Sequence, residues 1–138
     1  MFTFAFVVVF ALSEASDDHG QIESGIEPDH SKQFAQRACL AIAVMLVFGT
    51  LMYALACAAM FSMVFKFTLN KMRNLSWLYI SPSNQYDWQF LSLVMGYHDR
   101  DIVKDNWEVL KHSHKVKLAG AAQYCFELLV VVITFIIL

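Results

Sequence analysis

The uncharged run from Ala38 to Phe65 constrains this chain more than any other feature of its sequence. Arg37 and Lys66 bracket about 28 residues without a charge. As a helix, this run would be about 42 Å long at 1.5 Å per residue. The hydrocarbon core of a bilayer is about 30 Å thick, so a helix of this length would have to tilt or protrude. The run predicts a membrane-spanning helix over about 38–65.

A second apolar run, 118–138, is also long enough to cross a bilayer and carries a single charged residue, Glu127. Of the 138 residues in the chain, 58% are hydrophobic, which is more than a soluble domain of this size needs. We therefore predict an all-α integral membrane protein with two transmembrane helices, over about 38–65 and 118–138. Together, residues 38–138 would form a helical membrane domain.

The segment before this domain divides by composition into an apolar part, 1–15, and an acidic part, 16–37. The apolar part is too short to span a bilayer and resembles the core of a signal peptide, but no Lys or Arg precedes it. We favour a retained membrane anchor over a cleaved signal. Gly20, Gly25 and Pro28 predict irregular structure for the acidic connector.

Between the two predicted spans lies a polar segment, 66–117. Ser81 and Pro82 have the chemistry of a helix start, and Asp99 or Asp101 could cap a second helix. We expect one or two interfacial or extramembrane helices in this segment.

The same segment holds eight of the ten Lys and Arg residues. The positive-inside rule places it on the cytoplasmic or matrix side. A single helix over 38–65 would then put the acidic connector, 16–37, on the opposite side.

The polar residues of the last span gather on one helical face, because they are spaced by three, four and seven residues. In the first span, small residues recur every fourth position and would let another helix approach closely. We predict helix packing or an intramembrane polar site at Thr50, Tyr53, Ala54, Ala58, Ser62, Gly120, Gln123, Glu127 and Thr134, and Tyr124 shares the polar face of the last span.

Glu127 admits two interpretations if it lies near the middle of its span, and a third interpretation is that the span boundaries are misplaced and Glu127 is shallow. An ionised carboxylate at the centre of a bilayer costs at least about 2.5 kcal/mol, so it is usually turned inward and paired or protonated. The first interpretation is a structural carboxylate that is hydrogen-bonded or ion-paired and helps assembly. The second is a site that binds or relays a proton or another cation. A count of residues from Lys66 and Lys117 places Glu127 level with Ala56.

No metal, cofactor or catalytic constellation is expected. Cys39, Cys57 and Cys125 lack the spacing of a metal or redox motif, and His112 and His114 lie on different faces of a helix. The sequence contains no nucleophile with a base and no glycine-rich phosphate loop, so we do not expect an enzyme or a small-molecule substrate.

Lys111, Lys115 and Lys117 form a basic flank before the last span, suited to anionic lipid headgroups. The net charge of −2 gives no excess of positive charge for nucleic acid. The expected partners are the lipid bilayer and other membrane protein subunits.

These features favour a non-catalytic accessory or assembly subunit of a larger membrane complex, such as a respiratory-chain or ATP synthase complex. The alternative is a small proton- or cation-conducting or channel-auxiliary protein that uses Glu127. The incomplete signal pattern and the absence of disulfide-type cysteine spacing favour the mitochondrial inner membrane over the secretory pathway and the plasma membrane.

Overall fold

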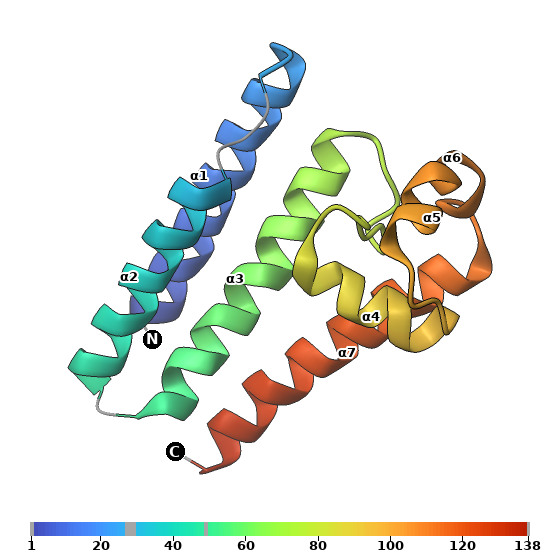
Figure 1. Ribbon diagram of the computed structural model, residues 1–138. Coiled ribbons are helices and arrows are strands. Elements are labelled where there is room, and N and C mark those ends of the chain that lie inside the picture. Colours follow the sequence, from blue (N-terminus) through green and yellow to red (C-terminus); the bar gives the residue numbers. More distant parts are fainter. Residues whose placement is uncertain (1, 27–29, 49, 138) are drawn as a thin grey trace. The chain divides into compact units, whose positions relative to one another are not determined.

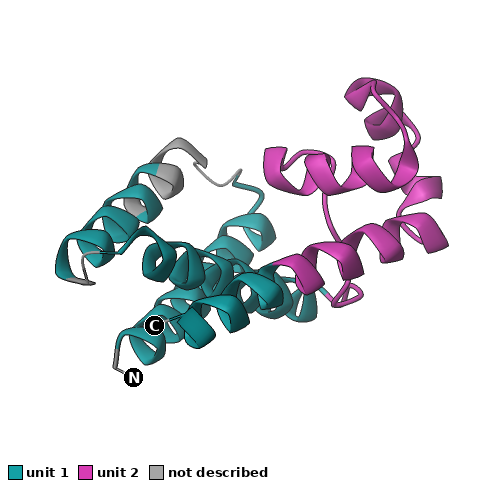
Figure 2. Ribbon diagram, turned by 90° about the horizontal axis from the view of Figure 1, so that it is seen from below, with its two compact units in different colours: residues 1–73, 127–138 teal, residues 74–126 magenta. Residues whose placement is uncertain are grey.

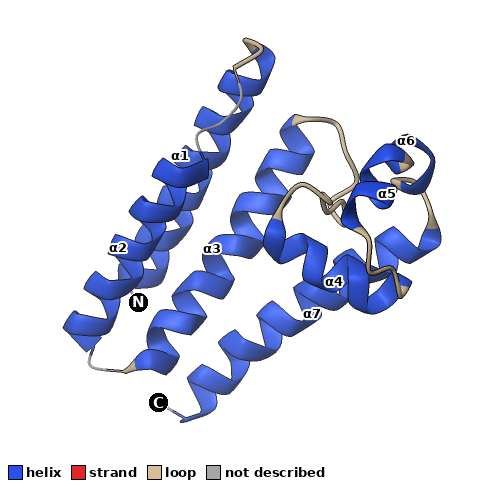
Figure 3. Ribbon diagram, viewed as in Figure 1, coloured by secondary structure: helices blue, strands red, loops and turns tan. Residues whose placement is uncertain are grey.

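Helices make up all the regular structure in the part of the chain that this computed structural model describes, residues 2–26, 30–48 and 50–137 (Figures 1 and 3). The all-α prediction is confirmed for these residues. The elements are α1 (Phe2–Glu23), α2 (His30–Phe48), α3 (Leu51–Met72), α4 (Gln85–Met95), α5 (Arg100–Asp105), α6 (Trp107–Leu110) and α7 (His114–Ile137).

The chain forms two compact units. Unit 1 comprises residues 1–73 and 127–138, and unit 2 comprises residues 74–126 (Figure 2). Helix α7 contributes its first half to unit 2 and its second half to unit 1. The segment predicted to lie between the spans, 66–117, overlaps unit 2 from residue 74 onward.

Helix α1 is longer than the predicted apolar segment of residues 1–15. It continues through polar residues to Glu23, so the prediction of irregular structure is wrong for residues 16–23. Gly20 lies inside the helix, where glycine costs about 1 kcal/mol relative to alanine. Gly25 follows the helix with a φ of +73°, a conformation that glycine adopts without strain. Pro28 lies outside the described residues.

The single helix predicted over 38–65 is also wrong, because α2 ends at Phe48 and α3 begins at Leu51. Thr50 has extended backbone angles (φ −128°, ψ 129°) at the N-cap of α3. Glycine and threonine are among the weaker helix formers, so the sequence at 49–50 is a low-cost place to interrupt a helix. Two shorter helices can then pack against each other and against α1.

The three N-terminal helices of unit 1 alternate in direction. Helices α1 and α3 run the same way, since the ring centroid of Phe4 is 5.2 Å from that of Tyr53 and the ring centroid of Phe10 is 5.6 Å from that of Phe61. Helix α2 returns in the opposite direction, because its C-terminal Val44 joins the core of Val7, Ala11, Ala54, Cys57 and Phe61.

This arrangement brings the acidic end of α1 to the same end of unit 1 as the C-terminal end of α3. The expectation that the acidic connector and the basic segment face opposite sides depended on one helix over 38–65. That expectation loses its basis when the helix is divided.

Unit 2 is built around α4 and the first half of α7, with a core of Ile80, Leu91, Met95, Val116 and Ala119. The side chain of Asn84 caps α4 by accepting hydrogen bonds from the N–H groups of Tyr86 and Asp87. The side chain of Asp99 caps α5 in the same way, as the sequence predicts. Helix α4 therefore begins three residues after the start predicted near Pro82.

Two described helices are long and apolar enough to cross a membrane, Leu51–Met72 and His114–Ile137. Their bounds replace the predicted 38–65 and 118–138. Both helices extend beyond the predicted apolar runs, so α3 includes Lys66 and α7 includes Lys115 and Lys117.

Candidate functional site

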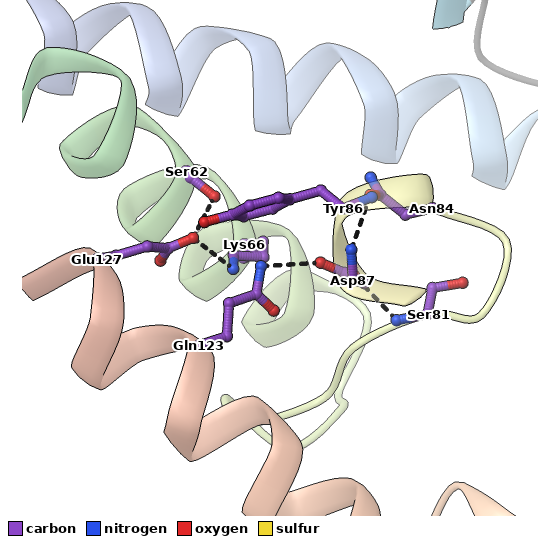
Figure 4. Close-up of polar contacts among 8 residues, drawn as sticks. All are labelled: Ser62, Lys66, Ser81, Asn84, Tyr86, Asp87, Gln123 and Glu127. Carbon is purple, nitrogen blue, oxygen red and sulfur yellow. Dashed lines mark hydrogen bonds and ion pairs between the residues drawn. The ribbon is translucent and has the colours of Figure 1, made fainter. Parts of the chain in front are cut away.

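Glu127 lies in unit 1, where its carboxylate has two partners from α3 (Figure 4). Its Oε1 atom accepts a hydrogen bond of 2.7 Å from the Ser62 hydroxyl and lies 2.9 Å from the Lys66 ammonium nitrogen. The Glu127 side chain is 1% exposed and that of Lys66 is 11% exposed. The carboxylate is therefore held by a cation and a hydroxyl of the same chain.

Lys66 is the functional residue that sequence reasoning missed. It was used as the boundary of the first span, whereas α3 continues past it to Met72. The sequence held one signal for this role of Lys66. Ser62 and Lys66 are four residues apart, so they share a helical face and can contact the same carboxylate. The count of residues from Lys66 and Lys117 placed Glu127 level with Ala56. Ala56 lies ten residues before Lys66, which is the side chain that pairs with Glu127.

Thr134 makes a second polar contact between α7 and α3 within unit 1. Its hydroxyl lies 2.9 Å from the backbone oxygen of Val130 and 3.3 Å from that of Met52. Because Met52 meets Thr134 while Ser62 meets Glu127, the two helices run antiparallel here. A buried carboxylate at one level and a buried hydroxyl at another fix the register between them.

The four small residues predicted to recur along one face, Thr50, Ala54, Ala58 and Ser62, do not share one environment. Ala54 is buried in the core with α1 and α2, Ala58 is exposed, and Ser62 binds Glu127. Thr50 precedes the helix, and Tyr53 packs against Phe4. At 3.6 residues per turn, a spacing of four drifts about 40° per step, so such a series winds around the helix.

Ala54→Leu should destabilise unit 1 by about 1–3 kcal/mol, because added methylene groups overpack a filled core. Ala58→Leu is the matched control on the exposed face and should change stability by no more than about 0.5 kcal/mol. Thermal unfolding of both variants in mild detergent measures the difference. Equal losses at the two positions would contradict the packing of α1 against Ala54.

The remaining polar residues of the predicted stripe belong to unit 2. Gln123 is fully buried, and its side-chain amide donates a hydrogen bond of 3.1 Å to Asp87 (Figure 4). The second carboxylate oxygen of Asp87 accepts a hydrogen bond of 2.9 Å from the Ser81 N–H. Tyr124 packs against Trp77. The predicted stripe is thus divided between two structural environments.

Asp87 and Arg100 organise the start of α4, and neither was predicted from the sequence. The Arg100 guanidinium donates hydrogen bonds to the backbone oxygens of Pro82 and Ser83 and to the side-chain oxygen of Gln85. In the sequence, each residue is one of many charged residues of the polar segment 66–117, and no spacing sets it apart. Only the packing of the loop onto α4 and α5 reveals these contacts.

Gly120 allows the backbone of Leu78 to approach α7 closely. A Cβ atom at this position would lie 2.0 Å from the backbone oxygen of Leu78. The loop that precedes α4 therefore contacts α7 at a point where any side chain would collide with it.

The basic flank is only partly free of internal contacts. Lys111 forms an ion pair with Glu108, whereas Lys115 and Lys117 are exposed. Among the described residues, no group of three or more His, Cys, Asp or Glu side chains could hold a metal ion. Cys39, Cys57 and Cys125 are free thiols.

No protein-family model, curated protein or solved structure matches this chain.

Proposed function

We propose that this chain is an integral membrane protein in which α3 and α7 cross the bilayer, and that it is a non-catalytic accessory or assembly subunit of a larger membrane complex. The membrane assignment is supported by the length and apolar composition of both helices. It is also supported by exposed apolar side chains along them, including Leu51, Leu55, Leu129 and Ile136.

The observation that carries the structural role is the contact of Glu127 with Lys66 and Ser62. A conduit needs a carboxylate that releases its ion or proton and accepts another. Here the carboxylate lies beside an ammonium group, which neutralises it locally and competes with any other cation for the same oxygen. Its role in this proposal is to hold α7 against α3.

The proposed complex is a respiratory-chain or ATP synthase complex of the mitochondrial inner membrane. The three cysteines are free thiols, which is consistent with a compartment where proteins are not stabilised by disulfides. The proposed partners are other membrane subunits, with anionic lipid headgroups at the exposed Lys115 and Lys117.

The proposal is tested by purifying the tagged full chain from its membranes in mild detergent and identifying the proteins that accompany it. A reproducible set of membrane subunits at fixed stoichiometry is the expected result. The same chain, reconstituted alone into lipid vesicles, should conduct neither protons nor Na⁺ or K⁺.

The accessory role would be wrong, and the conduit right, if the wild-type chain conducted protons or cations and this flux disappeared in the double variant Lys66→Met/Glu127→Gln. The double change is needed because Glu127→Gln alone would leave the Lys66 ammonium buried beside a neutral amide. Lys71→Met, an exposed change on the same helix, serves as the control and should leave any flux unaltered.

A further inference from the structure

The charged residues of unit 1 are sorted along its helices. Within the described residues, α1 carries its first charge at Glu14, α2 carries its last at Arg37, α3 carries its first at Lys66, and Glu127 is the only charge in the α7 part of unit 1. The uncharged ends lie together, since Phe4 contacts both Tyr53 and Phe135. Unit 1 therefore has one charged end and one uncharged end.

The surface of the uncharged end is apolar on every helix that forms it. Exposed side chains include Phe6 and Val9 of α1, Leu46 and Val47 of α2, Leu51 of α3 and Ile136 of α7. At 100° per residue, the exposed apolar residues of 128–137 cover more than half the circumference of α7. A protein partner covers one face, whereas apolar surface distributed over several helices matches a lipid bilayer.

The charges closest to the uncharged end are wholly or partly buried, and they form ion pairs with one another. The Arg37 guanidinium lies 3.9 Å from the Glu14 carboxylate and stacks over the rings of Phe61 and Phe65 at 4.9 and 4.7 Å. Lys66 and Glu127 form the other pair. Charged residues inside membranes are turned into the bundle and paired in this way.

These pairs let the apolar outer surface continue beyond the first charges. Phe67, one residue after Lys66, is an exposed apolar side chain. From Leu51 to Met72, α3 is about 33 Å long at 1.5 Å per residue, which matches the hydrocarbon core. Length and composition alone do not identify α2 as a membrane-spanning helix, because its apolar part, Arg37–Val47, is shorter than a span.

From this arrangement we infer that α1 and α2 enter the bilayer together with α3 and α7, so that unit 1 is a four-helix membrane module. Residues 24–26, which follow α1, then lie on the same side of the membrane as the C-terminal end of α3. The inference rests on the proposed insertion of α3 and α7. If α3 crosses the bilayer, Ser24 can reach the side of Lys71 only when α2 crosses it as well.

The test is the sidedness of single cysteines in the full chain. Ser24→Cys and Lys71→Cys place thiols at exposed positions of unit 1. Sealed right-side-out and inside-out vesicles are treated with a membrane-impermeant maleimide. The wild-type chain, with its three native cysteines, gives the background, and labelling in detergent gives the accessible total. We expect both introduced thiols to react from the same side.

A second pair, Ile26→Cys and Arg73→Cys, repeats the measurement at other exposed positions and guards against one misfolded variant. Reaction from opposite sides, in protein that stays in the membrane after alkaline carbonate extraction, overturns the four-helix insertion and leaves the proposed function intact. Release of the chain by carbonate instead overturns the proposed membrane function, and the inference with it.

Discussion

Lys66→Met should destabilise the chain by about 3–5 kcal/mol, the range observed when one partner of a buried ion pair is removed. The loss arises because the Glu127 carboxylate, 1% exposed, would remain inside unit 1 without its cation. The double variant Lys66→Met/Glu127→Leu should recover most of this loss, since apolar residues of similar volume replace a buried pair at little cost. Thermal unfolding in mild detergent, followed by circular dichroism, measures the wild-type chain, the single variants Lys66→Met and Glu127→Leu, and the double variant.

The matched control is Lys71→Met, an exposed change on the same helix that should alter stability by no more than about 0.5 kcal/mol. The ion-pair account would be wrong if Lys66→Met behaved like this control. It would also be wrong if the double variant lost as much stability as the two single variants together, because independent positions add in this way.

Gly120→Ala should destabilise unit 2 by about 3 kcal/mol, at the upper end of the range for overpacking, although it adds a single methyl group. The new Cβ atom would lie 2.0 Å from the Leu78 backbone oxygen, and a backbone oxygen cannot move aside as a flexible side chain can. The ring contact between Trp77 and Tyr124 lies close to this point, so tryptophan fluorescence during denaturant unfolding is a suitable readout.

Gly20→Ala is the matched control for this change. Gly20 lies inside α1, and a Cβ atom there would meet nothing within 4 Å. The substitution should stabilise α1 by about 0.5–1 kcal/mol, because alanine has the higher helix propensity. A loss of stability at Gly20 as large as that at Gly120 would show that the collision with Leu78 is not the cause.

The apolar runs predicted the helical class and the approximate positions of α3 and α7, but not the end of α2 at Phe48 and the start of α3 at Leu51. A run without charges does not reveal by periodicity whether it forms one long helix or a hairpin of two, since both are apolar on most faces. The break is decided by packing, in which Val44 and Ala54 meet in the same core.

Helix α1 shows the same limit in a polar segment. Residues 16–23 suggested a connector because of their charges and Gly20. Tertiary contacts outweigh that local preference, since Asp18 is buried and Glu14 pairs with Arg37. Capping was more predictable, because Asp99 acts through the N–H groups two and three residues later and needs no distant partner.

For the candidate site, the burial of Glu127 can be predicted from the cost of exposing a carboxylate in an apolar run. The identity of its partner, Lys66, cannot be predicted in this way. The partner depends on the offset between α3 and α7, which is fixed by where each helix begins and ends. Counting from the ends of the apolar runs places those limits at Lys66 and Lys117, although both residues lie inside helices.

The most direct measurement of the central contact is solid-state NMR dephasing between the lysine ¹⁵Nζ and glutamate ¹³Cδ nuclei in the full chain, reconstituted into lipid bilayers. A separation of 2.9 Å between Lys66 Nζ and Glu127 Oε1 predicts strong dipolar coupling. Lys66→Met assigns the signal, because the Lys111 and Glu108 pair remains in that chain. The account predicts a coupling that disappears in the Lys66→Met chain. An unchanged coupling in that chain would contradict it.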